Sequence, residues 1–208
     1  MKISTIVILV ENPFTRRDYD RFGVKYFCRL GYQVQILQVT PITKPHVYIQ
    51  HKCEVICEFH HVVRTKKELV TYLENTTNPY AINFVQYGLK SYAIFKVLSK
   101  LNRPYSLLAN PGFFRDLAQR DRFRLGLQRL KPSLIIDKIF RTMPPGWFNI
   151  HAADRMLIVG GEQAVSKQPN NESTRMIYAH HLDYDKYLEE ISVRRETRNI
   201  AVFLDEYA

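Results

Sequence analysis

The chain has 208 residues, of which 46% are hydrophobic and 24% are charged, and its formal net charge at pH 7 is +10. This composition is typical of a globular protein with one large core, and it excludes a low-complexity or disordered chain. The apolar residues 3–10 are followed by Glu11, Asn12 and Pro13 where a small-residue cleavage site would stand, so we predict a core strand and no signal peptide. Other uncharged apolar stretches are too short to cross about 30 Å of hydrocarbon. We therefore expect a cytoplasmic protein.

Strand and helix patterns alternate through the first half of the chain. The strand at residues 3–10 leads through a polar loop into a helix that ends at Gly31. The apolar face of this helix carries, at helical spacing, Phe22, Tyr26, Phe27 and Leu30. After it come a second strand at residues 34–39, a loop with two prolines, a third strand at 53–59, a short helix at 66–73 and a fourth strand at 81–85.

The second half continues the alternation. A helix through residues 93–101 and a strand at 105–109 precede residues 115–141, where we predict two amphipathic helices broken at Pro132. The remaining elements are strands at residues 154–159 and 175–179, a helix at 183–191 and a closing strand at 200–204. Strands that alternate with helices imply a parallel sheet. The predicted fold class is therefore α/β, a Rossmann-like parallel sheet with helices on both faces.

The cysteines and histidines of the third strand invite comparison with a metal site. Three cysteines cannot all pair within one chain, which favours a reducing compartment. Cys53 and Cys57 lie near three residues of another metal-binding type, His51, His60 and His61. In a strand, positions four apart are about 13 Å from each other, too far for one zinc ion or a disulfide. We predict core-facing cysteines and no metal site, although a different backbone would permit one.

Ligands of parallel sheets bind at the loops that follow the carboxyl ends of the strands. The residues at these positions that we take as cleft candidates are Glu11, Asn12, Arg16, Arg17, Gln86, Tyr87, Asn110, Gly160 and Gly161. A solvated loop is the alternative for the two arginines, and a tight turn is the alternative for the two glycines. His180 and His181 also follow a strand. They could include a general base, or they could be a structural pair held by hydrogen bonds. None of these residues can be named the catalytic base.

The loop after the first strand excludes two common cofactor sites. Dinucleotide and S-adenosylmethionine enzymes need glycines there so that the backbone can approach the cofactor, whereas this loop reads Glu-Asn-Pro-Phe-Thr-Arg-Arg. The end of the second strand lacks an acidic residue to hold a ribose, and no Gly-x4-Gly-Lys-Ser/Thr loop occurs. We therefore expect no cofactor in this chain.

Positive charge is concentrated in residues 115–141, which contain eight basic and three acidic residues. Apolar faces flanked by basic residues suit an anionic membrane surface, where each basic residue adds about 1 kcal/mol. The membrane-surface candidates are Arg120, Arg122, Arg124, Arg129, Lys131 and Trp147. The alternative, favoured for most of these residues, is that the apolar faces cover the sheet and the arginines are solvated. Nucleic acid is the least favoured partner.

Three segments together resemble the amino-terminal half of a GT-B glycosyltransferase of bacterial surface-polysaccharide biosynthesis. They are Asp-Tyr-Asp-Arg-Phe-Gly at residues 18–23 after the opening strand, Ala-Asp-Arg-Met-Leu-Ile-Val at 153–159, and Tyr-Ala-His-His-Leu-Asp-Tyr-Asp-Lys-Tyr-Leu at 178–188. In the last segment many members of that family carry Asn-Gly-Val-Asp. Here the corresponding residues are His-His-Leu-Asp, so only Asp183 matches.

This resemblance implies an acceptor-side domain over residues 1–190, a crossover linker over 191–198 and the first strand of a truncated second domain over 199–208. The second domain would bind the nucleotide-sugar donor, so the chain alone is expected to be inactive as a transferase. The cleft candidates would line the acceptor side, and the partner would be a glycan or lipid-linked acceptor at the inner face of a membrane. The rival hypothesis is a non-catalytic binding module whose basic face binds an anionic membrane or partner.

Overall fold

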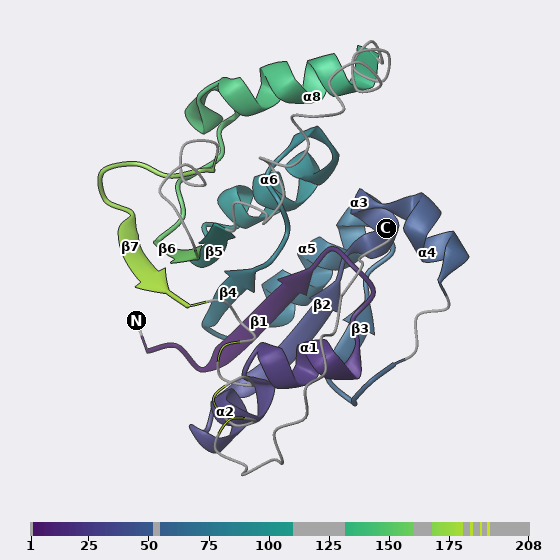
Figure 1. The fold of residues 1–208 in the computed structure, drawn as a ribbon, viewed down its shortest axis with the longest axis vertical. Coiled ribbons are helices and arrows are strands. Elements are labelled where there is room, and N and C mark those ends of the chain that lie inside the picture. Colours follow the sequence, from purple (N-terminus) through teal and green to yellow (C-terminus); the bar gives the residue numbers. More distant parts are fainter. Residues whose placement is uncertain are drawn as a thin grey trace, which may run out of the picture.

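The computed structural model describes residues 2–51, 55–109, 132–159 and 168–180, together with residues 184, 188 and 191. In this part of the chain, seven strands form one parallel sheet in the order β3-β2-β1-β4-β5-β6-β7 (Figure 1). The strands are β1 (Thr5–Val10), β2 (Gln33–Gln38), β3 (His60–Val62), β4 (Pro79–Asn83), β5 (Tyr105–Ala109), β6 (Arg155–Val159) and β7 (Arg175–Ala179). The predicted Rossmann-like α/β class is confirmed.

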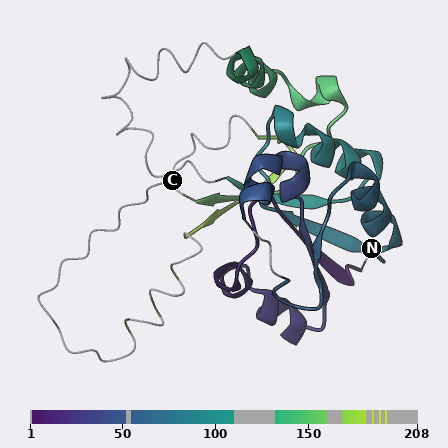
Figure 2. The same ribbon diagram turned by 90° about the vertical axis from the view of Figure 1, so that its right-hand side faces the viewer.

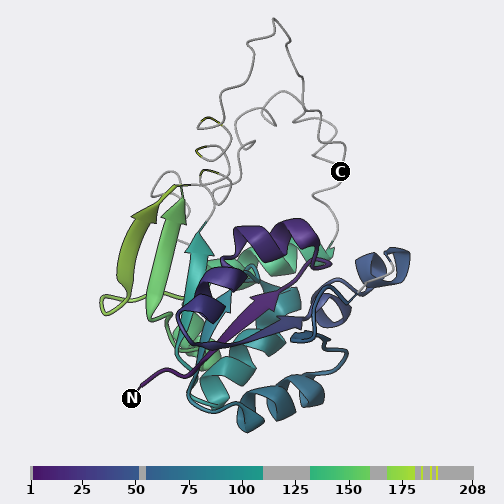
Figure 3. The same ribbon diagram turned by 90° about the horizontal axis from the view of Figure 1, so that it is seen from below.

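Helices cover both faces of the sheet (Figure 2, Figure 3). One face carries α1 (Arg16–Arg21) and α2 (Val24–Arg29), and the other carries α5 (Lys66–Asn75), α6 (Tyr92–Lys100) and α8 (Pro132–Thr142). The shorter helices are α3 (Thr40–Thr43), α4 (Pro45–Gln50) and the 3₁₀-helices η1 (Leu89–Ser91) and η3 (Pro145–Phe148). Among the helices that the structure describes, none is long and apolar enough to span a membrane.

The core consists of two layers of side chains on opposite faces of the sheet, and the interior strand β1 contributes to both. All six residues of β1 are buried, and successive side chains point to opposite faces. Val7 and Leu9 pack with the helical side chains of α5 and α6, whereas Ile6 and Ile8 pack with the layer that contains Val24 of α2. Apart from the buried Thr5, the residues of β1 are apolar, as the sequence pattern predicted for a strand buried on both faces.

The predicted third strand is placed wrongly by sequence. Residues 55–59 form a loop, residues 52–54 lie outside the described residues, and the strand that pairs with β2 begins at His60. Cys57 is therefore a half-buried loop residue and not a strand residue. The strand pattern failed because β3 is short and contains two histidines, while the more apolar run before it packs against the core as a loop.

Two further differences concern helices. The helix predicted before Gly31 is divided into α1 and α2 at Gly23, whose φ of +67° lies in the left-handed region that favours glycine. The loop predicted around the two prolines forms α3 and α4, because Pro41 and Pro45 occupy the first turns of these helices, where a proline is tolerated. The first of the two predicted basic helices and the closing strand at residues 200–204 lie outside the described residues.

His60 is a buried histidine that joins β3 to β2. Its side chain is 3% exposed, Nδ1 accepts the Ile56 N–H at 3.3 Å, and Nε2 lies 3.1 Å from Oε1 of Gln38. The Phe14 N–H donates to the same Gln38 oxygen at 2.9 Å. Burial, assisted by the neighbouring His61, lowers the pKa of His60 to about 4.

This burial predicts an acid-sensitive fold. The unfolded chain takes up the proton at the ordinary histidine pKa of about 6.5, so the contribution of His60 is complete above that pH and is lost as the pH falls toward about 4. The expected slope is about 1.4 kcal/mol of unfolding free energy per pH unit. Urea unfolding across this range should show a flatter profile for His60→Gln, while the control His46→Gln, at an exposed position on α4, keeps the wild-type slope. Parallel profiles for His60→Gln and the wild type would contradict the assignment.

Candidate functional site

Polar side chains gather at the carboxyl edge of the sheet, beside β1 and β4. β1 pairs with β2 on one side and with β4 on the other, so the loops after β1 and β4 diverge and leave a crevice, as in other doubly wound sheets. A cleft of about 540 Å³ lies there. Its described lining residues are Glu11, Thr43, Lys44, His46, Val47, Gln86, Gly88, Leu89, Lys90, Ser91, Asp137 and Arg141.

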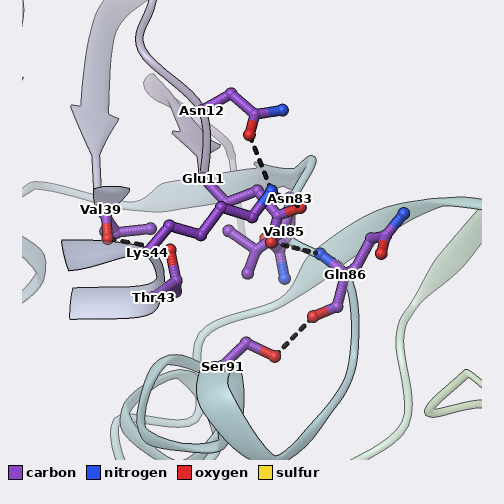
Figure 4. A network of polar contacts seen from close by, with 9 residues as sticks. All are labelled: Glu11, Asn12, Val39, Thr43, Lys44, Asn83, Val85, Gln86 and Ser91. Carbon is purple, nitrogen blue, oxygen red and sulfur yellow. Dashed lines mark hydrogen bonds and ion pairs between the residues drawn. The ribbon is translucent and has the colours of Figure 1, made fainter. Parts of the chain in front are cut away.

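Glu11, directly after β1, connects the loops of three strands. It is 8% exposed, and its Oε1 lies 3.0 Å from Nζ of Lys44, at the junction of α3 and α4 (Figure 4). The same Nζ donates to Oδ1 of Asn12 at 2.7 Å, and the Gln86 N–H donates to the second carboxylate oxygen of Glu11 at 3.3 Å. A nearly buried carboxylate without a partner would cost several kcal/mol, so these contacts fix the floor of the cleft.

Side chains of the turn after β4 form hydrogen bonds with its own backbone. Asn83 is buried, and its Oδ1 accepts the Val85 N–H at 3.0 Å. Ser91 Oγ donates to the carbonyl oxygens of Gln86 and, at 3.1 Å, of Gly88 (Figure 4). These side-chain bonds replace regular secondary structure in the turn, so the backbone that faces the cleft has a defined path.

Helix α8 closes one side of the cleft. It contacts the turn after β4 through Asp137 and Arg141, and we call this pair the clasp. Asp137 accepts the Leu89 N–H at Oδ1 and the Arg141 Nε–H at Oδ2, both at 2.7 Å. A Cβ on Gly88 would lie 2.6 Å from Nη2 of Arg141 and 2.9 Å from Oδ1 of Asp137, so a larger residue here would displace the ends of these two side chains. Phe140 packs on Tyr87, with ring centroids 5.3 Å apart, and anchors the helix to the core.

The structure brings together some of the predicted cleft residues. Glu11 and Gln86 line the cleft, and Asn12 joins it through Lys44. Tyr87 neighbours it in sequence, but its ring is 1% exposed in the core and is absent from the described lining. Burial raises the pKa of its hydroxyl to about 12, so it stays protonated at neutral pH.

Other predicted residues lie elsewhere. Arg16 and Arg17 begin α1, outside the described lining, and the Arg16 guanidinium lies 4.8 Å from the ring centroid of Tyr19. His180 stacks on Tyr184, with ring centroids 4.3 Å apart. Three of the cleft candidates lie outside the described residues, namely Asn110, Gly160 and Gly161.

Of the membrane-surface candidates, the structure describes Trp147, whose side chain is 74% exposed on η3. About half of the surface of three isoleucines of α8 is also exposed, at Ile135, Ile136 and Ile139, while Phe140 of the same helix is buried. Among the described side chains of α8, Phe140 therefore packs into the core, whereas the three isoleucines remain at the surface. The other candidates lie outside the described residues, namely Arg120, Arg122, Arg124, Arg129 and Lys131.

Sequence reasoning missed the residues that complete the cleft. Lys44 stands in a segment predicted as loop, and its nearness to the end of the second strand was the available signal. Asp137 and Arg141 are spaced i, i+4, which predicts their ion pair but not its position beside Gly88. These contacts join segments 33 and 48 residues apart in the sequence.

The described cleft offers hydrogen-bond acceptors and donors and several charges. Its carboxylates and its lysine and arginine side chains can bind polar groups of a ligand, whereas no serine or cysteine of the lining is paired with a histidine as an activated nucleophile. Among the described residues, no group of three or more metal-binding side chains gathers. Comparisons with protein families, with curated proteins and with solved structures found no match to this chain.

Proposed function

We propose that this chain is the acceptor-side domain of a GT-B glycosyltransferase of surface-polysaccharide biosynthesis. In this proposal the cleft binds a glycan or lipid-linked acceptor, and a second domain binds the nucleotide sugar. The observation that supports it is the cleft between β1 and β4 of a Rossmann-like sheet, which is lined mainly by polar and charged residues. Its volume of about 540 Å³ lies within the usual range of small-ligand sites.

The chemistry of the lining suits a polyhydroxylated ligand. Sugar hydroxyls donate and accept hydrogen bonds, and the cleft presents acceptors at Glu11 and Asp137 and donors at Gln86 and the basic side chains. Sugar transfer also requires stabilisation of a leaving nucleotide diphosphate. The loop after β1 contains no glycine that would let its backbone approach a diphosphate, which supports a separate donor domain.

The purified chain is expected to bind bacterial glycan fragments and to transfer no sugar from nucleotide sugars. Saturation-transfer NMR against a fragment library measures the binding. Glu11→Gln should weaken binding about tenfold, because a charge-assisted hydrogen bond contributes about 1.5–3 kcal/mol, whereas the exposed control Glu74→Gln should not. The absence of binding by every glycan, or measurable transfer or nucleotide-sugar hydrolysis by the chain alone, would sink the proposal.

A second candidate function is attachment to an anionic membrane surface. The half-exposed isoleucines of α8 and the exposed Trp147 favour it, because a surface helix with apolar side chains and a nearby tryptophan can enter the headgroup region. The net positive charge of residues 115–141 would add an electrostatic attraction. This attachment is compatible with the acceptor-side proposal and also describes a non-catalytic binding module.

Liposome co-sedimentation tests the membrane proposal. The wild type should bind vesicles with anionic lipid and not neutral vesicles. Trp147→Ser should reduce binding by removing an apolar contact, and the combined change of Arg120, Arg122, Arg124 and Arg129 to Gln should reduce its dependence on lipid charge. Lys100→Gln, an exposed charge on α6, is the matched control. The proposal would be contradicted if binding did not depend on lipid charge and if neither variant reduced it.

A further inference from the structure

The cleft contains more positive than negative side chains. Its described lining includes three cations, Lys44, Lys90 and Arg141, and two carboxylates, Glu11 and Asp137. Lys44 is paired with Glu11 at 3.0 Å, and Nε of Arg141 is paired with Asp137 at 2.7 Å. No carboxylate of the described lining remains for Lys90. The side chains of the described lining therefore sum to one net positive charge, which belongs to Lys90, a residue exposed to solvent at the cleft.

Lys90 is held next to the clasp of α8. The preceding residue, Leu89, donates its N–H to Asp137, and Gly88 lies against the guanidinium of Arg141. The backbone of Lys90 therefore lies one residue from the contact with Asp137, in the same cleft lining. Among the described residues, no hydrogen bond uses the terminal nitrogens of Arg141, because the contact with Asp137 occupies Nε.

These observations separate an anionic ligand from a neutral one. A neutral sugar can use the donors and acceptors of the cleft but does not balance the charge of Lys90. A carboxylate or phosphate group would balance it and could accept hydrogen bonds from the guanidinium edge, which suits the two-oxygen geometry of such groups. The net charge of +10 would also favour the approach of an anion.

We propose that the cleft binds an anionic carbohydrate, with its carboxylate or phosphate at Lys90 and Arg141. The carbohydrate part of this statement rests on the proposed function, whereas the anionic part rests on the charges of the cleft. Lys90 and Arg141 are thus assigned as specificity-determining residues, which select a uronic acid or a sugar phosphate over a neutral sugar. Glu11 and Lys44 line the same cleft.

Amide NMR titrations with four probes test the proposal. Methyl glucuronide and methyl glucoside differ mainly in one carboxylate, while glucose 1-phosphate and inorganic phosphate separate a sugar phosphate from the bare anion. The structure predicts shifts of the 86–91 turn with at least one charged sugar, about tenfold tighter binding than of methyl glucoside, and weakening on added salt. Lys90→Gln should remove most of this preference, and Lys100→Gln should keep it.

The outcomes distinguish the two proposals. Equal affinity for the neutral and charged sugars, or an unchanged preference in a folded Lys90→Gln variant, overturns the anionic inference and leaves the glycan-binding function in place. Binding of inorganic phosphate that depends on Lys90, without binding of any sugar, supports the anionic site and contradicts the proposed function. Tighter binding of glucose 1-phosphate than of inorganic phosphate supports both. Failure of all four probes to bind contradicts both.

Discussion

The ion pair between Glu11 and Lys44 is the interaction on which the cleft depends. Because β1 is an interior strand buried on both faces, it brings the carboxylate after it to the carboxyl edge of the sheet with little access to water. A carboxylate in that position requires a cation or hydrogen-bond donors. Lys44 comes from the chain after β2 and the N–H of Gln86 from the chain after β4, so satisfying one carboxylate fixes three loops.

The second constraint comes from helix α8, which approaches the same turn from the other side. Asp137 accepts the Leu89 N–H, and the guanidinium of Arg141 lies close to Gly88, in the space that a side chain there would occupy. In both places a carboxylate accepts a backbone N–H of a turn, and a cation neutralises that carboxylate. Of the charged side chains in the described lining, Lys90 is the one that these two ion pairs do not include. Its positive charge is the basis for the proposed anionic ligand.

Sequence patterns predicted the layers of the fold better than its contacts. The strands β5 and β7 have the bounds that the sequence indicated. For β5 the reason is its burial, which makes the strand an apolar run, whereas β7 is an edge strand whose residues are exposed or half-buried. The short β3 was missed because its buried residue, His60, is polar. A hydrogen bond to Gln38 satisfies it inside the protein, and the sequence shows no apolar run at this position. Lys44 and Asp137 were missed because their partners depend on strand order and helix docking, which local patterns do not specify.

A double-mutant cycle between Glu11 and Lys44 tests this account most directly. Urea unfolding would be measured for the wild type, Glu11→Gln, Lys44→Met and the combined variant, with each variant checked for a native spectrum. If the ion pair organises the cleft, the two changes couple by about 1 kcal/mol or more, since either one alone leaves a charge without its partner. Effects that add within about 0.3–0.5 kcal/mol would contradict the account.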